Sequence, residues 1–250
     1  MKIVAVIPAR YKSTRFKGKP LAPIMGKPMI RHVYEGVAGS SRLSDVIVAT
    51  EDERIYNACR EFGAKAVMTK DTHQSGTDRI IEAISEIDAD IILNIQGDEP
   101  LVNEEIVDAL ISPFTAGNIS YSSVMTPIYS STEFFDPNNV KVVVDKDGFA
   151  LYFSRCPIPY DRENPGNPKD EKGVYGFKHL GFYGYTRNFI ETFGKLPPSF
   201  LEKKEMLEQL RAIENGFRIK MEKVSISTIP VDVPEDILRV ENFITKSYNR

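Results

Sequence analysis

Apolar runs alternate with segments of helical period along roughly the first 100 residues of the chain. The runs are continuous and rich in Ile, Val and Ala, which is typical of strands buried on both faces. The segments between them carry their apolar residues on one helical face. The expected strands are 2–7, 46–50, 64–68 and 90–95, and the expected helices are 28–37, 51–62 and 77–87. The pattern predicts an α/β fold with a mainly parallel sheet, helices on both sides, and ligands at the carboxyl ends of the strands.

From about residue 120 the pattern changes to strand-like runs without long helices between them. Asp147-Gly148 separates two of these runs and is a typical hairpin turn. This part predicts a smaller antiparallel extension of the sheet, with a long loop rich in Gly and Pro at 161–176. The expected strands of the extension are 121–127, 140–145, 149–154 and 180–185.

The C-terminal part returns to helices and one strand. Residues 200–215 form one expected helix, which leaves Glu208 on its solvated far side and Gln209 at its flank. The apolar stripe of this helix is expected to consist of Met206, Leu210 and Ile213. A strand at 217–224 and a helix that begins near Pro234 complete the pattern.

The length of the chain, 250 residues, is enough to bury a substantial core in one domain. We therefore expect a single α/β domain over 1–250. Residues 1–119 and 200–250 would form its core, and 120–199 would form the smaller lobe.

Composition and charge favour a small-molecule partner. The chain is 42% hydrophobic and 27% charged with a net charge of −3, so it has no overall attraction to nucleic acid or to an anionic membrane. Cys59 and Cys156 lack metal-type spacing and are typical of reduced thiols, a disulfide being the less favoured alternative. The apolar N-terminal run is too short to span a membrane, and its basic residues follow it, unlike those of a secretory signal. We expect a cytoplasmic protein.

Positive charge is concentrated directly after the first expected strand. These cations, together with Gly18, which allows close approach of the backbone, would form a cradle for a polyphosphate. The loop has neither G-x-x-x-x-G-K-[ST] nor G-x-G-x-x-G, so side-chain cations would have to hold the phosphates. A solvated basic loop is the alternative. The cations are Arg10, Lys12, Arg15, Lys17 and Lys19.

Two carboxylates are candidate magnesium ligands. Asp98, in "NIQGDEP", follows the fourth expected strand and would face the same crevice as the basic loop. Mg²⁺ often takes one or two carboxylates together with substrate phosphates, although a turn role explains Asp98 equally well. Asp232, in "IPVDVPED", lies just ahead of the last expected helix, where Asp commonly caps. Glu235 and Asp236 compete with it for any metal role.

Two further segments carry polar residues that could contact a ligand. In "HQSGTDR", Ser75 and Thr77 lie at an expected helix start, where free N–H groups can meet an anion or a base carbonyl, and capping explains them equally well. In "HLGFYGY", His179, Gly181 and Tyr183 share one face of a strand. A hydrogen-bonded structural role is the favoured alternative for His179.

In these segments the chain resembles the family of 3-deoxy-manno-octulosonate (Kdo) cytidylyltransferases. The resemblance runs in order along nearly the whole chain, through "IPARYKSTRFKGKPL", "GKPMIRHV", "IVAT", "HQSGTDR", "NIQGDEP", "VKVVVD", "ALYFSRCPIPYDR", "HLGFYGY", "LEKKEMLEQLR" and "VDVPEDI". It implies a Rossmann-like, three-layer nucleotidyltransferase fold with a mainly parallel sheet and a smaller antiparallel lobe. Residues 1–119 and 200–250 would bind the nucleotide, and 120–199 would bind the sugar and form a homodimer.

The resemblance also implies roles for single residues. The implied nucleotide ligands are Arg10, Arg15, Lys19, Ser75, Gly76 and Asp98. The implied magnesium ligands are Asp98 and Asp232, which with Arg10 and Lys19 form the catalytic set. The implied sugar-pocket residues are Arg79, Gln96, Arg155, His179, Tyr183, Glu208 and Gln209. One departure concerns Asp232: the chain has Pro-Val-Asp-Val-Pro at 230–234, where the family usually has a Gly-Val-Asp-Thr-Pro type of segment.

The implied reaction transfers CMP from CTP to the anomeric hydroxyl of Kdo, releases pyrophosphate and uses Mg²⁺. The sequence has no convincing Ser/His/Asp or Cys/His constellation, and this reaction needs no protein nucleophile. The alternatives are a cytidylyltransferase for 8-amino-Kdo or sialic acid, a sugar-1-phosphate nucleotidylyltransferase, and a catalytically silent nucleotide-binding protein. "HLGFYGY" and "EMLEQLR" favour the Kdo branch, and the presence of both Asp98 and Asp232 argues against a silent protein.

Overall fold

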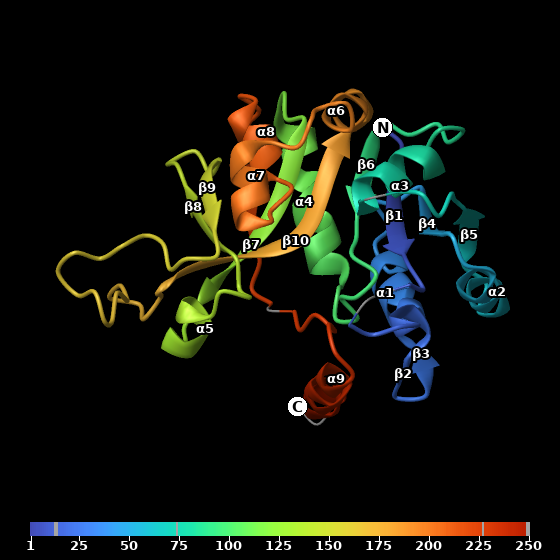
Figure 1. Cartoon of the computed structure of the whole chain (residues 1–250), viewed down its shortest axis with the longest axis horizontal. Helices are drawn as coiled ribbons and strands as arrows, with labels where there is room; N and C mark the ends of the chain where they lie inside the picture. Colours follow the sequence, from blue (N-terminus) through green and yellow to red (C-terminus); the bar gives the residue numbers. More distant parts are fainter. Residues whose placement is uncertain (13–14, 74, 227, 249–250) are drawn as a thin grey trace. The chain divides into compact units, whose positions relative to one another are not determined.

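The computed structural model describes residues 1–12, 15–73, 75–226 and 228–248 (Figure 1). They divide into two compact units, Met1–Asp108 with Thr228–Arg250, and Ala109–Ser227. These boundaries differ from those expected from the sequence, because 109–119 and 200–227 belong to the second unit. The functions expected of the two parts of the chain stay predictions.

Parallel strand pairing organises the first unit. Its strands are β1 (Ile3–Ala9), β4 (Asp45–Thr50), β5 (Lys65–Met68) and β6 (Ile91–Asn94). β1 pairs with β6 on one side and with β4 on the other, and β4 pairs with β5, all in parallel. In this register Ala5 lies between Val46 and Leu93, and all three side chains are buried. The four expected strands are confirmed, and the carboxyl ends of β1 and β6 lie at the same edge.

The helices of the first unit follow the predicted order. They are α1 (Met29–Ala38), α2 (Glu53–Glu61), α3 (Gly76–Ala83) and α9 (Glu235–Tyr248). The structure also has η1 (Lys19–Leu21), the short pair β2 (Pro23–Ile24) and β3 (Lys27–Pro28), and α4 (Glu104–Ala116), which were not expected from the sequence. α4 begins in the first unit and ends in the second. Its fully buried residues, Ile106, Val107, Leu110 and Ile111, have helical spacing, so the signal for this helix was present in the sequence.

The C-terminal segment packs on the first unit through a small apolar core. Ile24, Met29, Val231 and Val240 are fully buried together in this core. The chain therefore returns from the second unit and lays residues 228–248 against the start of the first. This return brings Val231, and with it the neighbouring acid of the "VDVPED" segment, next to elements near the N-terminus.

Antiparallel pairing dominates the second unit. Its strands are β7 (Tyr121–Ile128), β8 (Lys141–Val144), β9 (Ala150–Ser154), β10 (Gly176–Thr186) and β11 (Lys220–Lys223). β10 pairs with β7 and β8, and β8 pairs with β9, all antiparallel, whereas β11 is parallel to β7. The Asp147-Gly148 turn is confirmed, since Asp145 N–H donates to the carbonyl of Phe149 at 2.8 Å and Gly148 has φ +78. β10 begins at Gly176, so it is longer than the expected strand.

The expected helix at 200–215 is wrong as a single helix. The helices of the second unit are α5 (Ser131–Phe135), α6 (Arg187–Phe193), α7 (Phe200–Glu205) and α8 (Leu210–Glu214). Met206 ends α7 in the left-handed conformation, with φ 54, and it is 76% exposed. The break changes the helical phase, so that Leu207 and Gln209 are buried instead. Of the predicted apolar stripe, Leu210 is buried and Met206 is not.

Residues 155–175 form the expected long loop, because no helix or strand lies between β9 and β10. Among the described residues, no helix is long and apolar enough to cross a membrane.

Candidate functional site

A cavity of about 410 Å³ opens at the carboxyl ends of β1 and β6 in the first unit. Three segments line it: the basic loop after β1, the first residue of α3, and the loop after β6. Gly76 comes from α3, and both arginines and two of the lysines of the basic loop line the cavity. The lining residues with polar side chains are Arg10, Lys12, Arg15, Lys19, Gln96 and Asp98. The predicted convergence of the basic loop with the "NIQGDEP" segment is therefore present.

Tyr11 closes the basic loop into a compact turn. Gly18 N–H donates to the carbonyl of Tyr11 at 2.9 Å, and Gly18 has φ +75, a conformation that favours glycine. A Cβ at Gly18 would also lie 3.2 Å from the Tyr11 ring. The Arg54 guanidinium lies 3.3 Å from the centroid of that ring, and Tyr11 N–H donates to Glu51 at 3.1 Å. These contacts fix both ends of the loop that carries the cations.

Gly97 lets the loop after β6 approach β1 closely. A Cβ at this position would lie 2.7 Å from the carbonyl oxygen of Pro8, which is backbone and has no rotamer with which to withdraw. The side chains on either side of Gly97, Gln96 and Asp98, thereby reach the cavity. Gln96 donates from its amide to Asn94 Oδ1 at 3.2 Å.

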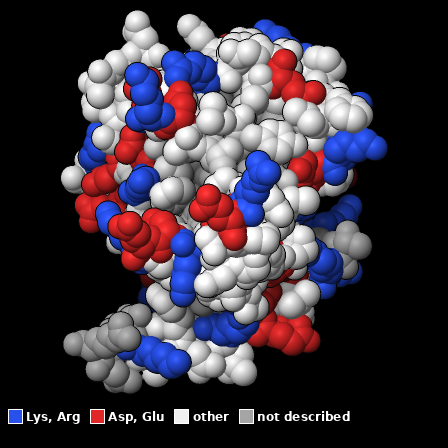
Figure 2. All heavy atoms as spheres, turned by 90° about the vertical axis from the view of Figure 1, so that its left-hand side faces the viewer, with Lys and Arg blue, Asp and Glu red and all other residues white. Residues whose placement is uncertain are grey.

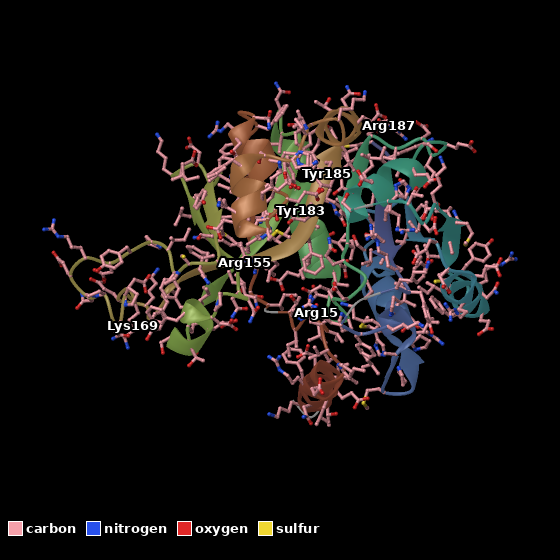
Figure 3. The ribbon with its side chains drawn as sticks, in the orientation of Figure 1. Arg15, Arg155, Lys169, Tyr183, Tyr185 and Arg187 are labelled. Carbon is pink, nitrogen blue, oxygen red and sulfur yellow. The ribbon has the colours of Figure 1, made fainter. Side chains whose placement is uncertain are left out.

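Lys19 lies between the two predicted magnesium ligands. Its Nζ donates to Asp98 Oδ2 at 2.7 Å and lies 3.7 Å from Asp232 Oδ1. Arg15 donates to the same oxygen of Asp232 at 2.9 Å (Figure 3 labels Arg15). A backbone hydrogen bond of 2.9 Å from Val231 N–H to the carbonyl of Asp98 holds the two segments together. Two acids far apart in the sequence therefore meet at one largely buried ammonium group, whereas Lys12, Arg15 and Lys17 of the same loop are exposed to solvent.

Asp236, in the first turn of α9, holds the segment that leads into this helix. Asp236 Oδ2 accepts from the backbone N–H groups of Asp232 and Val233 at 3.0 and 3.1 Å. Burial raises the pKa of the Asp236 carboxyl, but these hydrogen bonds and the nearby Arg239 together lower that pKa below its ordinary value. The carboxylate of Asp232 is thus available to Arg15 and Lys19, although a Val stands at 233 where the family usually has a Thr.

The start of α3 is capped locally. Ser75 Oγ accepts from Asp78 N–H at 3.0 Å, and Asp78 accepts from Ser75 N–H at 3.1 Å, which is a complete capping box. The capping alternative for Ser75 is confirmed, and Gly76 beside it lines the cavity. Arg10 donates to the carbonyl of His73 at 2.8 Å and so joins the cradle to this segment.

Arg79 lies inside the first unit. Its side chain is 1% exposed, pairs with Glu51 at 3.0 Å and donates to Thr69 Oγ1. Burial lowers the pKa of the guanidinium, and nearby Glu51 opposes that effect. The guanidinium is thus engaged within the protein, and the predicted contact of Arg79 with a sugar stays a prediction.

A chain of four side chains runs through the second unit. Tyr183 OH donates to Gln209 Oε1 at 3.2 Å, and Gln209 Nε2 lies 3.3 Å from His179 Nδ1. His179 Nε2 lies 2.9 Å from Ser123 Oγ, which donates to the carbonyl of Phe182 at 2.7 Å. All donors and acceptors are matched if His179 carries its proton on Nε2. Tyr183 lies on β10 (Figure 3).

Burial sets the protonation of this network. It lowers the pKa of His179 to about 3, so the imidazole is neutral near pH 7. It also raises the pKa of Tyr183, and the charge of Glu208 adds to that effect. Sequence reasoning missed Ser123, which lies in an apolar strand and carries no signal until β7 is paired with β10.

The other two predicted sugar-pocket residues of the second unit lie close to α7 and α8. Glu208, which the helical pattern predicted to be a solvated surface residue, is 29% exposed and lies 3.5 Å from Arg211. Arg155 donates to the carbonyls of Glu205 at 2.7 Å, Pro137 at 3.1 Å and Met206 at 3.5 Å (Figure 3).

Among the described residues, no group of three His, Cys, Asp or Glu side chains is arranged to hold a metal ion. Asp98 and Asp232 offer two hard oxygen ligands beside the cavity. Two carboxylates suit Mg²⁺ when substrate phosphates and water complete its coordination.

Several known proteins are similar to this chain over most of its length. A family model described as cytidylyltransferase matches residues 4–224. The 3-deoxy-manno-octulosonate cytidylyltransferase of Geobacter metallireducens is 50% identical over 245 residues, covering 96% of this chain and 96% of that protein. The protein of the same name from Thermodesulfovibrio yellowstonii is 46% identical over 247 residues, with 95% and 96% covered.

Solved structures match as well. A structure of CMP:2-keto-3-deoxy-manno-octonic acid synthetase complexed with CTP has a TM-score of 0.91 and 41% identity, covering 99% of this chain and 100% of that chain. A 4-diphosphocytidyl-2C-methyl-D-erythritol synthase from Anaerococcus prevotii has a TM-score of 0.64 at 13% identity, covers 98% of each chain, and so shares the fold alone. The predicted Rossmann-like nucleotidyltransferase fold is confirmed.

Proposed function

Because the chain belongs to the 3-deoxy-manno-octulosonate cytidylyltransferase family, we propose that it transfers CMP from CTP to the anomeric hydroxyl of Kdo. The products would be CMP-Kdo, for lipopolysaccharide synthesis, and pyrophosphate. The observation that carries the proposal is the meeting of Lys19 with Asp98 and Asp232 at a cavity lined by further cations. A site that binds a polyphosphate as its metal complex needs cations for the phosphates and carboxylates for the metal ion, close together.

The cations of the cradle would hold the triphosphate. Arg10 and Lys19 lie at the cavity, and Arg15 reaches it from the same loop. Guanidinium groups bind phosphate oxygens in pairs, and the Lys19 ammonium supplies a compact positive charge. These fixed cations would stabilise the charge that builds up on the leaving pyrophosphate and would align CTP for in-line attack. Gly76, with Ser75 in its cap, would meet the cytosine.

The chemistry is a single displacement at the α-phosphorus. The anomeric hydroxyl of Kdo gives up its proton to water and forms the new P–O bond, the bond from the α-phosphorus to the α,β-bridging oxygen breaks, and pyrophosphate leaves with that electron pair. No protein nucleophile is needed, so the residues bind, align and neutralise charge.

Magnesium fits the acids of the cradle. Asp98 and Asp232 would hold it, because they are the carboxylates that converge on Lys19. When bound, Mg²⁺ neutralises phosphate charge and lowers the pKa of a coordinated hydroxyl. Lys19 donates to Asp98 Oδ2 and Arg15 donates to Asp232 Oδ1, so these two cations would fix the direction of both ligands before the nucleotide arrives.

The second unit would bind the keto-sugar acid. His179, Tyr183 and Gln209 form one hydrogen-bonded network, and the neutral imidazole adds no charge of its own. Arg155 would attract the carboxylate of the sugar, and Glu208 would accept from its hydroxyl groups. From the first unit, Gln96 and Arg79 are proposed to complete the sugar contacts.

A homodimer and a cytoplasmic location are part of the proposal. The second unit exposes large apolar side chains, including Leu151 at 57% and Tyr160 at 75%, and β9 pairs only with β8 among the described strands. On the face that Figure 2 shows, acidic and basic side chains are interspersed, which does not favour nucleic acid as a partner. Exposed Cys156 and buried Cys59 are free thiols, which suits a reducing compartment.

Pyrophosphate release tests the proposal. CTP, UTP, ATP and GTP are each combined with Kdo, 8-amino-Kdo, sialic acid and glucose 1-phosphate in the presence of Mg²⁺. We expect release above background with CTP and Kdo, and the ratio of kcat/KM for Kdo and 8-amino-Kdo identifies the acceptor. Release with glucose 1-phosphate but with no keto-sugar acid would overturn the proposal, and release in no combination would favour a silent nucleotide-binding protein.

A further inference from the structure

The turn between α7 and α8 has an unusual backbone for its residue. Met206 adopts φ 54 and ψ 49, in the left-handed region that L-residues other than Gly, Asn and Asp rarely enter. Its side chain is 76% exposed, so its packing does not compensate for the backbone conformation. Other groups must therefore hold this turn.

Glu205, the residue before the turn, is held on both its side chain and its backbone. Its carboxylate accepts from Ser154 Oγ at 2.7 Å and from Arg155 N–H at 2.9 Å. Its carbonyl accepts from Arg155 Nε at 2.7 Å, and the carbonyl of Met206 accepts from the same guanidinium at 3.5 Å. Arg155, at the end of β9, thus hydrogen-bonds to both peptide groups that flank the left-handed residue.

Lys141 in turn holds the backbone of Arg155 in place. It is fully buried, and its ammonium donates to the carbonyls of Asp136 at 2.9 Å, Asn139 at 2.5 Å and Arg155 at 2.6 Å. The backbone of Arg155 is therefore anchored by a buried charge that its three hydrogen bonds satisfy. Glu205 is consequently held by a rigid frame rather than by mobile surface groups.

The turn decides which way the next residues face. Leu207 N–H donates to the carbonyl of Glu202 at 3.1 Å, and after this turn Leu207 and Gln209 are 6% and 2% exposed. Gln209 then donates towards His179 and accepts from Tyr183. A helix that continued through Met206 would have a different phase, and it would not bring Gln209 inward in the same way.

We propose that Glu205 is a positioning residue for the keto-sugar-acid site: through the end of β9 it holds the left-handed turn that directs Gln209 to His179 and Tyr183. The proposal rests on the proposed function, because it takes these three residues as the site for the sugar. Glu205 itself makes no contact with the substrate; it acts through the turn.

The first test compares Glu205→Gln with Glu171→Gln, a matched control in the exposed loop of the same unit. A Gln side chain has one acceptor oxygen where the carboxylate has two, so it cannot accept from both Ser154 Oγ and Arg155 N–H, and the hold on the turn is weakened. We expect the KM for Kdo to rise about tenfold, as for the loss of about one buried hydrogen bond, while the KM for CTP stays within about twofold. Glu171→Gln should leave both KM values unchanged.

Substitutions at Met206 give a second test that leaves Glu205 intact. A β-branched residue strongly disfavours the left-handed conformation, whereas glycine adopts it freely. Met206→Val should therefore raise the KM for Kdo as Glu205→Gln does, and Met206→Gly should not. In the double variant Glu205→Gln with Met206→Gly, part of the lost affinity for Kdo should return, which a merely destabilising effect would not produce.

Hydrogen exchange of the amides of 207–211 provides a readout without substrate. We expect these amides to exchange at least about tenfold faster in Glu205→Gln than in the control. Unchanged hydrogen exchange in Glu205→Gln would overturn the inference. So would a wild-type KM for Kdo in Glu205→Gln and Met206→Val, or an equal rise of the KM for Kdo and the KM for CTP. Absence of turnover with any keto-sugar acid in the wild-type enzyme would instead overturn the proposed function, and the inference with it.

Discussion

At the scale of single residues, the candidate site consists of charged groups that balance one another. The Lys19 side chain is only 12% exposed, and it is held by Asp98 at 2.7 Å. If Asp98 is removed, Asp232 Oδ1 remains 3.7 Å from the Lys19 ammonium and still balances its charge. Single substitutions here should therefore alter the reaction far more than the stability, provided that the second acid, Asp232, remains to balance Lys19.

Asp98→Asn should lower kcat/KM at least about 100-fold, because the amide cannot replace a carboxylate as a metal ligand. Removing one group that stabilises charge in a transition state commonly lowers the rate by this factor. The fold should survive, since Asp232 still faces Lys19. Steady-state kinetics at several magnesium concentrations and thermal unfolding measure the two effects. The control is Asp88→Asn, whose side chain is 83% exposed. Wild-type turnover in Asp98→Asn would remove this residue from the mechanism.

His179 makes the stability of the protein depend on pH. Its pKa is lowered to about 3 by burial, against 6.5 in the unfolded chain, so between these values the unfolded state binds a proton that the folded state does not. Stability is full above pH 6.5 and falls as the pH drops towards 3. At pH 5 this one group should cost roughly 2 kcal/mol, measured by urea unfolding. A His179→Gln variant should lack this component, and an identical pH dependence in both proteins would contradict the assignment.

At the scale of elements, glycines decide where backbone segments can meet. Gly97 brings the loop after β6 against Pro8, and Gly18 closes the basic loop on Tyr11. Met206 adopts the left-handed conformation, which ends α7 and redirects the chain. The geometry of both units thus depends on a few residues with special backbone requirements.

Gly97→Ala should destabilise the protein by about 1–3 kcal/mol, because the new Cβ meets a backbone oxygen and the loop must move. The KM for CTP should rise as well, since Asp98 follows directly. Gly117→Ala is the matched control, because a Cβ at Gly117 would meet no atom within 4 Å. Urea unfolding and CTP titration measure the two effects, and equal stability of both variants would argue against a close approach at Gly97.

Continuous apolar runs were enough to predict the four parallel strands, and the turn residues Asp147-Gly148 predicted the β8–β9 hairpin. The single helix at 200–215 was wrong because periodicity alone cannot reveal a left-handed residue at Met206. The same limit hid the burial of Gln209. The meeting of Asp98 with Asp232 depends on a backbone bond from Val231, a contact between distant segments that no local pattern encodes.

At the scale of the whole molecule, the predicted contacts with CTP and those with the keto-sugar acid lie largely in different units. The basic loop, Asp98 and Asp232 belong to the first unit, and the network of His179, Tyr183 and Gln209 belongs to the second. We therefore expect effects on CTP and on the keto-sugar acid to separate in kinetics. Gln96 and Arg79 are the exceptions, because both are proposed sugar contacts that lie in the first unit, where Arg79 already has a buried pair with Glu51.

The central claim is that the end of β1 and two distant acids together clamp CTP with its metal. A crystal structure of the protein with CTP and Mg²⁺ tests it most directly. We expect the triphosphate in the cavity against Arg10, Arg15 and Lys19, with the metal ion on Asp98 and Asp232. A triphosphate bound elsewhere, or a metal ion that touches neither acid, would contradict it.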